Sequence, residues 1–344
     1  MSLNLSTWWT ALQRPIKLEE KRQWDALDVV SKWLIATRGT VTQLTLYAGA
    51  MAGLLAWRDG HFAWLPWLVT TLGLFLAHST ENLLNDYIDF TRGIDEDNYY
   101  RSQYGVHPLV HKFWSKKDWL RWFLTGGILA TLAGLFILIY TSFSPIVIGL
   151  IAIGAFMILF YAYPLKYLAL GEIVIYVLWG LLIVPGIYTV LAGRFTPNLG
   201  NVVLTGLAFG LGFGSFNWGK HIDKLSADKI KGVGTLPVRL GEKAARYVNI
   251  ATLVLAYGIV LYLVFVARFL TPAVLIVFLA SGRLWTVIKL LSKPRPNEAP
   301  PGFQLWPRWF STPQLKHVRL FGGLYILGLL ADTLLRIYRP EFWH

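Results

Sequence analysis

The chain has 344 residues, of which 55% are hydrophobic and only 15% are charged, whereas about 25% of the residues in a typical soluble domain carry a charge. Lysine and arginine outnumber aspartate and glutamate by 32 to 19, which gives a net charge of +13. Because the basic residues lie in short connections between long apolar runs, we assign them to membrane loops and expect no nucleic-acid partner. The absence of cysteine excludes disulfides, thiolate nucleophiles and cysteine-bound metals.

The apolar runs predict an all-α membrane protein with about nine transmembrane helices, because about 20 apolar residues span a bilayer. One uncharged run, 122–165, is twice that length and is expected to break at 142–145. In chain order, the predicted spans are residues 39–57, 62–80, the two halves of 122–165, 173–193, 195–219, 247–267, 270–288 and 320–331.

The loops on the two sides of these spans differ in charge. Basic residues are abundant before the first span and between spans two and three, six and seven, and eight and nine, whereas the alternate loops hold at most one, such as Arg58, Arg194 or Arg268. The positive-inside rule then places the N-terminus in the cytoplasm. We expect an integral, multi-pass protein of the cell membrane, in contact with membrane lipids, whose polar loops and active site face the cytoplasm.

The chain divides into a short segment and one large domain. Residues 1–38 are charged and form either an amphipathic interfacial segment or a cytoplasmic tail. Residues 39–338 form a single transmembrane domain with two long polar loops, 85–118 and 220–243. A third loop, 289–316, contains six prolines and is typical of a semi-rigid linker without chemistry of its own.

Amides and carboxylates follow the second predicted span. Asn82 and Asp86 are four residues apart, as are Asn85 and Asp89, so the members of each pair share a face if the helix continues. Asp95 lies beyond a glycine and could turn back toward them. Hard divalent ions such as Mg²⁺ prefer oxygen ligands of this kind. A solvated helix end, balanced by nearby lysines, is the competing interpretation.

A second polar group follows the sixth predicted span. Asn217, His221, Lys224 and Asp228 recur at helical spacing, and Asp223 lies slightly off their face. Two such groups on one side of the membrane, interleaved with basic residues, suit an anionic ligand. Carboxylates alone would repel a diphosphate, whereas bridging Mg²⁺ turns the repulsion into attraction.

At these residues the sequence resembles the UbiA superfamily of intramembrane prenyltransferases. The superfamily pattern Asn-Asp-x-x-Asp, followed by a further Asp, stands here at 85–89 with Asp95. The gap to Asp95 is similar to that of the dihydroxynaphthoate (menaquinone-type) branch, as are the segments 163–172, 228–232 and 235–241. The resemblance covers about residues 39–335.

The resemblance implies a bundle of about nine helices around a central cavity, with 85–118 and 220–243 as cap loops. It implies transfer of a polyprenyl group from its diphosphate to an aromatic or other lipophilic acceptor similar to a quinone precursor, assisted by two Mg²⁺ ions. It gives catalytic roles to Asn85, Asp89 and Asp228. The candidate metal ligands are Asn85, Asp86, Asp89, Asp95, Asp223 and Asp228, and the candidate substrate-binding residues are Asn82, Arg101, Tyr163, Lys166, Asn217, Lys220, His221 and Lys224.

The second metal motif departs from the family pattern Asp-x-x-x-Asp. Lys224, not an acid, stands four residues before Asp228. Either the helix contains a one-residue bulge, or Asp223 or His221 replaces the missing ligand.

Two other functions remain open. A UbiA-type membrane terpene cyclase would act on a prenyl diphosphate without an acceptor, and the altered second motif and the 16 Trp, 16 Tyr and 20 Phe are compatible with it. An anion or ion transporter is the third possibility, although such proteins often place charges at mid-membrane rather than at one face. Mg²⁺-dependent release of diphosphate distinguishes an enzyme from a transporter, and dependence on an acceptor distinguishes a transferase from a cyclase.

Overall fold

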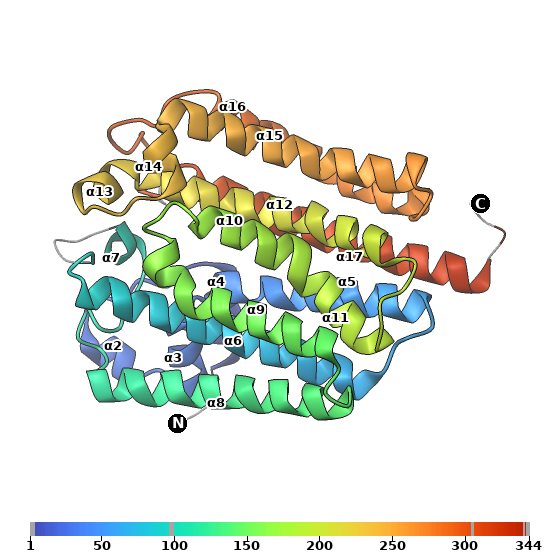
Figure 1. The fold of residues 1–344 in the computed structure, drawn as a ribbon. Coiled ribbons are helices and arrows are strands. Elements are labelled where there is room, and N and C mark those ends of the chain that lie inside the picture. The colour runs from blue at the N-terminus through green and yellow to red at the C-terminus, as the bar shows by residue number, and fades with distance from the viewer. Residues whose placement is uncertain (1–3, 96–99, 304–305, 340, 342–344) are drawn as a thin grey trace.

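The computed structural model describes residues 4–95, 100–303, 306–339 and 341. Over these residues the chain is helical and has no strand, and the long helices run side by side along one axis (Figure 1). Residues 96–99 of the first predicted cap loop and 304–305 of the proline-rich loop lie outside the described residues. The predicted all-α class is confirmed.

The helices follow one another in this order. The N-terminal segment contains α1 (Leu5–Gln13), α2 (Lys21–Asp25) and α3 (Val29–Ala36), and the short α4 (Gly39–Thr42) follows it at the start of the first predicted span. The first half of the bundle contains α5 (Leu44–Arg58), α6 (Trp64–Thr91), the short α7 (Tyr100–Tyr104), α8 (Lys116–Tyr140), and α9 (Pro145–Phe160) continued by the π-helical turn η1 (Tyr161–Leu165). The second half contains α10 (Gly171–Tyr176), η2 (Val177–Leu182), α11 (Ile183–Ala192), α12 (Leu199–Asp223), α13 (Leu225–Ile230), α14 (Leu236–Leu240), α15 (Glu242–Leu261), η3 (Tyr262–Val266), η4 (Pro272–Ala280), α16 (Ser281–Leu291) and α17 (Ser311–Tyr338).

Seven helical segments of the described chain are long and apolar enough to cross a membrane. They are Lys116–Tyr140, Pro145–Leu165, Gly171–Ala192, Leu199–Asp223, Glu242–Val266, Pro272–Leu291 and Ser311–Tyr338. Together with α5 and α6 they correspond to the nine predicted spans. Because α5 has only 15 residues and α6 ends in carboxylates, the number nine stays a prediction, as does the cytoplasmic N-terminus.

Two predicted helix boundaries can be compared directly with the structure. The break expected at 142–145 is present, since α8 ends at Tyr140 and α9 begins at Pro145, a residue well suited to the first turn of a helix. The last span was expected at 320–331, but α17 already begins at Ser311. Lys316 and Arg319 interrupt the apolar run without interrupting the helix.

The loops gather at two ends of the bundle (Figure 1). We call one end the capped end: it carries the N-terminal segment, the loops 166–170 and 224–241, and the described parts of the loops 92–115 and 292–310. The loops 59–63, 141–144, 193–198 and 267–271 lie at the other end, which we call the opposite end. The loops predicted to be basic are therefore all at the capped end.

Helix α12 lies in the centre of the bundle. Of its apolar window 67% is buried, the largest share among the seven candidate spans. Glycines allow close packing on the span Gly171–Ala192: a Cβ on Gly210 would lie 2.4 Å from the Gly180 backbone, and one on Gly214 would lie 2.1 Å from the Tyr176 ring. Such small-residue contacts let membrane helices approach closely.

The N-terminal segment is folded against the capped end. Trp24 is 1% exposed and stacks on Phe113, with ring centroids 5.6 Å apart. The Asp28 carboxylate caps α3 by accepting hydrogen bonds from the backbone of Val30 (2.9 Å) and Ser31 (3.0 Å). The Arg319 guanidinium, from α17, donates hydrogen bonds to backbone carbonyls of α1 and α4. The segment thus forms a wall beside the polar ends of α6, α12 and α17.

Candidate active site

A cavity of about 100 Å³ lies at the capped end, between the N-terminal segment, α6, α12 and the start of α17. Part of its wall is apolar or aromatic: Tyr161, Ile175, Phe213 and Phe216. Five basic side chains also line it: Arg14, Arg38, Arg101, Lys220 and Arg308. Glu81 is the one acidic residue among its described lining residues. The excess of positive charge suits an anionic ligand beside an apolar one.

The helix predicted through the first motif is present, because α6 continues to Thr91. Asn85 and Asp89, one turn apart on it, converge on the ammonium of Lys166. The Lys166 Nζ donates to Asn85 Oδ1 at 3.0 Å and to the two Asp89 carboxylate oxygens at 2.6 and 2.9 Å. All three side chains are buried. The structure therefore brings together three of the predicted site residues, with Asn85 and Asp89 around the cation of Lys166.

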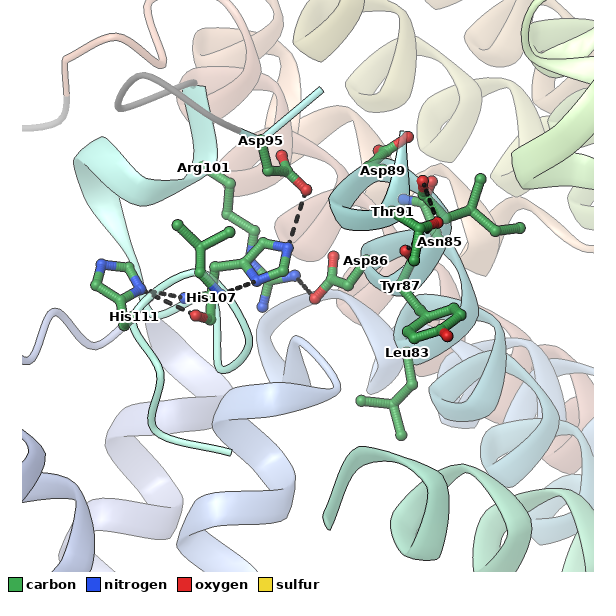
Figure 2. Close-up of polar contacts among 12 residues, drawn as sticks. Leu83, Asn85, Asp86, Tyr87, Asp89, Thr91, Asp95, Arg101, His107 and His111 are labelled. Atoms are coloured by element: carbon green, nitrogen blue, oxygen red, sulfur yellow. Dashed lines mark hydrogen bonds and ion pairs between the residues drawn. The ribbon is translucent and has the colours of Figure 1, made fainter. Parts of the chain in front are cut away.

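The second pair on α6 contacts the N-terminal segment instead. Asn82 donates to the Thr37 carbonyl at 3.1 Å, and the Asp86 carboxylate is shared by Arg38 and Arg101. Figure 2 shows Asp86 facing Arg101. Because two guanidinium groups flank one buried carboxylate, Asp86 ties α6 to both the N-terminal segment and the first cap loop.

Asp95 pairs with a histidine of its own loop. His107 Nε2 lies 2.9 Å from Asp95 Oδ2, and Figure 2 shows these two side chains facing each other, away from Asp89. His107 is fully buried, and its backbone N–H donates to His111 Nδ1 at 3.0 Å. Asp95 thereby holds the first cap loop folded back on itself.

The second motif forms two separate pairs near the end of α12. Lys224 Nζ lies 3.0 Å from Asp228 Oδ1, one turn later. His221 pairs with Glu172 at the start of α10, and the other Glu172 oxygen accepts a hydrogen bond from the Leu236 backbone at 3.2 Å. His221 thus connects α12 to the second cap loop through Glu172 and lies outside the cavity lining.

Asn217 and Lys220, on the preceding turns of α12, do line the cavity. The buried amide nitrogen of Asn217 has no hydrogen-bond partner in the part of the chain that the structure describes. Among those same residues, no carboxylate forms an ion pair with Lys220. Both groups are therefore available to a ligand.

The carboxylate of Asp223 holds the start of α17. Its oxygens accept hydrogen bonds from the backbone N–H groups of Phe310 (2.8 Å) and Ser311 (2.9 Å), and from the Tyr100 hydroxyl (3.1 Å). Asp223 is 5% exposed. It therefore joins three segments that are distant in the sequence: α7, the end of α12 and the proline-rich loop.

Two tyrosines near Lys166 differ in position. Tyr163 is 46% exposed and lies outside the cavity, beneath the Arg92 guanidinium at 4.3 Å from its ring centroid, whereas Tyr161 is buried and lines the cavity. Burial and the negative charge of Asp89 together raise the pKa of Tyr167 to about 12. The Tyr167 phenol therefore stays neutral beside the Lys166–Asp89 pair.

The sequence comparisons identify the family of this chain. Residues 46–309 match the UbiA prenyltransferase family. The chain belongs to that family. It is also 28% identical, over 221 residues, to the 1,4-dihydroxy-2-naphthoate octaprenyltransferase of Escherichia coli (strain K12); the match covers 62% of this chain and 70% of that relative. The resemblance inferred from the motifs is confirmed, and with it the assignment to a multi-pass membrane protein.

UbiA membership implies a divalent metal, and the residues present can be tested against it. No group of three or more His, Asp or Glu side chains is arranged to hold a metal within the described residues, because the candidate carboxylates contact basic or backbone groups. One donor set nevertheless fits: three oxygens of Asn85 and Asp89 lie within 3.0 Å of the Lys166 Nζ. The ammonium stands where a hard cation would bind.

Several residues of this UbiA site were missed in the sequence. Arg38 and Glu81 line the cavity, Glu172 holds His221, and Arg308 enters from the proline-rich loop. Arg38 was counted only as a loop charge, and the prolines around Arg308 suggested a linker. Of these residues, Glu81 could have been found from its spacing in the sequence, because it lies one turn before Asn85 on the same helix.

Proposed function

We propose that this UbiA family member is a Mg²⁺-dependent intramembrane prenyltransferase. It ionises a polyprenyl diphosphate and transfers the prenyl group to an aromatic or other lipophilic acceptor similar to a quinone precursor. The observation that carries the proposal is the convergence of Asn85 and Asp89 on a cation, beside a cavity with an excess of basic side chains. The name of the Escherichia coli relative supports an aromatic acceptor.

Asn85, Asp89 and Asp228 are the residues we expect to hold Mg²⁺, with Asp86, Asp95 and Asp223 as further candidates. Bound Mg²⁺ would neutralise the diphosphate and favour its departure. Asp86, Asp95 and Asp223 already contact Arg101, His107 and the start of α17, so we assign them first to shaping the cap loops. Lys224, which replaces the expected acid, pairs with Asp228 and would turn toward the diphosphate when metal binds.

We assign the remaining residues, which line the cavity or, as Lys166 does, contact its lining residue Asn85, to the two parts of the substrate. Lys166, Lys220 and Arg101 supply positive charge for the diphosphate oxygens, and the amides of Asn82 and Asn217 supply hydrogen bonds. Tyr161, Phe213 and Phe216 present aromatic faces to an allylic cation, which such faces attract. Tyr163 and His221 lie outside the cavity, where they position η1 and α10.

The side of the membrane on which the active site lies follows from the arrangement of the loops. A polyprenyl tail needs no transfer into water if its diphosphate meets the protein at the membrane surface. The capped end collects the basic loops, which the positive-inside rule assigns to the cytoplasm. We therefore propose that the active site faces the cytoplasm from the cell membrane.

The test is release of diphosphate by the purified protein in nanodiscs, with a panel of prenyl diphosphates. Each is supplied with Mg²⁺ or EDTA, and with or without dihydroxynaphthoate or hydroxybenzoate; the lipids are analysed by mass spectrometry. We expect release that requires both Mg²⁺ and an acceptor, with an adduct of the summed mass. Release without acceptor, giving a hydrocarbon or terpene alcohol, would instead identify a cyclase, and no release with any pair would contradict the enzyme assignment.

A further inference from the structure

The proline-rich loop between α16 and α17 is held in place at several points. The Arg295 backbone N–H donates to Glu242 at 2.8 Å, and its guanidinium donates to the Pro307 carbonyl at 3.1 Å and lies 4.1 Å from the centroid of the Trp306 ring. At the other end, Asp223 accepts from the backbone of Phe310 and Ser311. The described part of this loop is therefore a built element of the capped end.

The loop places one arginine in the cavity. Arg308 is only 5% exposed and lines the cavity, with its guanidinium 4.8 Å from the centroid of the Tyr104 ring of α7. Within the described chain, no carboxylate forms an ion pair with it and no carbonyl accepts a hydrogen bond from its side chain. A buried charge without an opposite charge is costly, so this position favours a bound anion.

Two other arginines of the cavity differ in this respect. Arg38 and Arg101 share the carboxylate of Asp86, which offsets part of their charge. Arg308 shares its lack of an acidic partner with Lys220, which reaches the same cavity from α12. Two cations from separate parts of the chain thus face one space, where Glu81 is the acidic residue of the described lining and forms an ion pair with neither of them.

We propose that the described part of this loop, 292–303 and 306–310, is a third cap of the active site and that Arg308 binds an oxyanion group of a substrate. The planar guanidinium can donate two parallel hydrogen bonds to a phosphate or carboxylate. It also lies over the Tyr104 ring, a favourable cation–π contact. Two substrates of the proposed reaction carry such a group: the prenyl diphosphate and an aromatic acceptor with a carboxylate. The inference rests on the proposed function and extends its binding site to a loop with no predicted role.

The experiment compares Arg308→Gln, Arg308→Lys and the wild-type protein in nanodiscs. Lys293→Gln is the matched control, since Lys293 is an exposed cation of the same loop. Three quantities are measured: affinity for inorganic pyrophosphate with Mg²⁺, KM for the prenyl diphosphate, and KM for dihydroxynaphthoate. Thermal unfolding of each variant is recorded separately.

We expect Arg308→Gln to weaken binding ten-fold or more, Arg308→Lys to restore part of the loss, and Lys293→Gln to match the wild type. Loss of pyrophosphate affinity with a raised KM for the prenyl diphosphate assigns Arg308 to the diphosphate; a raised KM for the acceptor alone assigns it to the carboxylate. If Arg308→Gln unfolds, the same binding and kinetic assays are read on Arg308→Lys alone, which should still bind more weakly than the wild type. If the Arg308 variants kept the wild-type pyrophosphate affinity and both wild-type KM values, the inference would be overturned, even if their melting temperature were lower. Failure of the wild type to turn over any pair would instead contradict the proposed function.

Discussion

The two ends of the bundle each contain a cluster of buried charged side chains, and the clusters differ in how far their acidic and basic groups offset one another. At the opposite end, Arg58 contacts Asp59 at 2.9 Å and Asp332 at 3.3 Å. The second Asp59 oxygen accepts from the Tyr188 hydroxyl at 2.6 Å, and Asp332 accepts from the Thr271 backbone at 2.6 Å. At the capped end, by contrast, cations of the cavity outnumber its acids.

The difference separates two uses of buried charge. The cluster at the opposite end joins the ends of α5, α11 and α17, and its charges contact one another, so it holds helices together. The capped end combines paired acids with a cavity and with cations that lack an acidic partner in the described chain. A closed, balanced network stabilises a fold, whereas an unbalanced one beside a cavity favours a ligand of opposite charge.

The largest expected effect on activity comes from Asp89. Asp89→Asn keeps the shape of the side chain but removes the charge that faces Lys166, and with it a metal ligand of the proposed site. We expect turnover to fall by about 10³-fold, on the order of 4 kcal/mol of transition-state stabilisation. The measurement is the rate of diphosphate release at saturating Mg²⁺.

The matched control for this change is Asp25→Asn, an exposed aspartate whose partner is the nearby Lys21. It should leave turnover and melting temperature unchanged. If Asp89→Asn released diphosphate at a near-normal rate, the assignment of the capped end as the metal site would be wrong.

Removing one cation from each end of the bundle tests whether the two clusters serve different purposes. Arg58 is buried between two carboxylates, so Arg58→Met leaves uncompensated charge and should cost about 3–5 kcal/mol of unfolding free energy. Lys220→Met removes a cation that has no such partner in the described chain, so stability should be equal or higher. Its KM for the prenyl diphosphate should rise about ten-fold, or about 1.4 kcal/mol.

Thermal unfolding and steady-state kinetics of both variants provide the measurement. The comparison would fail if Arg58→Met changed KM with little loss of stability, or if Lys220→Met lowered stability as much as Arg58→Met. Either result would mean that the two clusters serve the same purpose.

A smaller effect concerns the pH dependence of stability. Burial acts to raise the pKa of Asp59, but the charge of Arg58 and the hydrogen bonds from Tyr188 and Asn198 hold that pKa below its usual range. Because the folded pKa is lowered, the contribution of Asp59 is complete above about pH 4 and is lost as the pH falls through the folded value. The melting temperature of Asp59→Asn should therefore fall less than that of the wild type between pH 5 and pH 3. Parallel curves would contradict this.

What the sequence predicted at the first motif depended on short separations along one helix. Asn85 and Asp89 share a face because they are one turn apart, and α6 continues through both. Their partner Lys166 was a candidate from its motif. Arg38 could not be assigned in this way, because its contact with Asp86 joins segments separated by 48 residues.

The other omissions have the same physical origin. Arg58 was counted as the one basic residue of its loop, but its partner Asp332 is 274 residues away. Asp223 was a metal candidate from its neighbours on α12, whereas its carboxylate holds the backbone of residues that follow it by almost ninety positions. Such contacts depend on how helices pack, which periodicity in one segment does not determine.

The central claim is that the capped end binds a metal and a diphosphate. The most direct measurement is a structure of the full chain with Mn²⁺ and a non-hydrolysable prenyl thiodiphosphate, in which anomalous scattering locates the metal. We expect Mn²⁺ between Asn85 and Asp89, Lys166 displaced from Asp89 toward the diphosphate, and no metal at Asp59 or Asp332. A bound thiodiphosphate elsewhere, with the Lys166–Asp89 contact unchanged and no metal beside it, would contradict the proposed site.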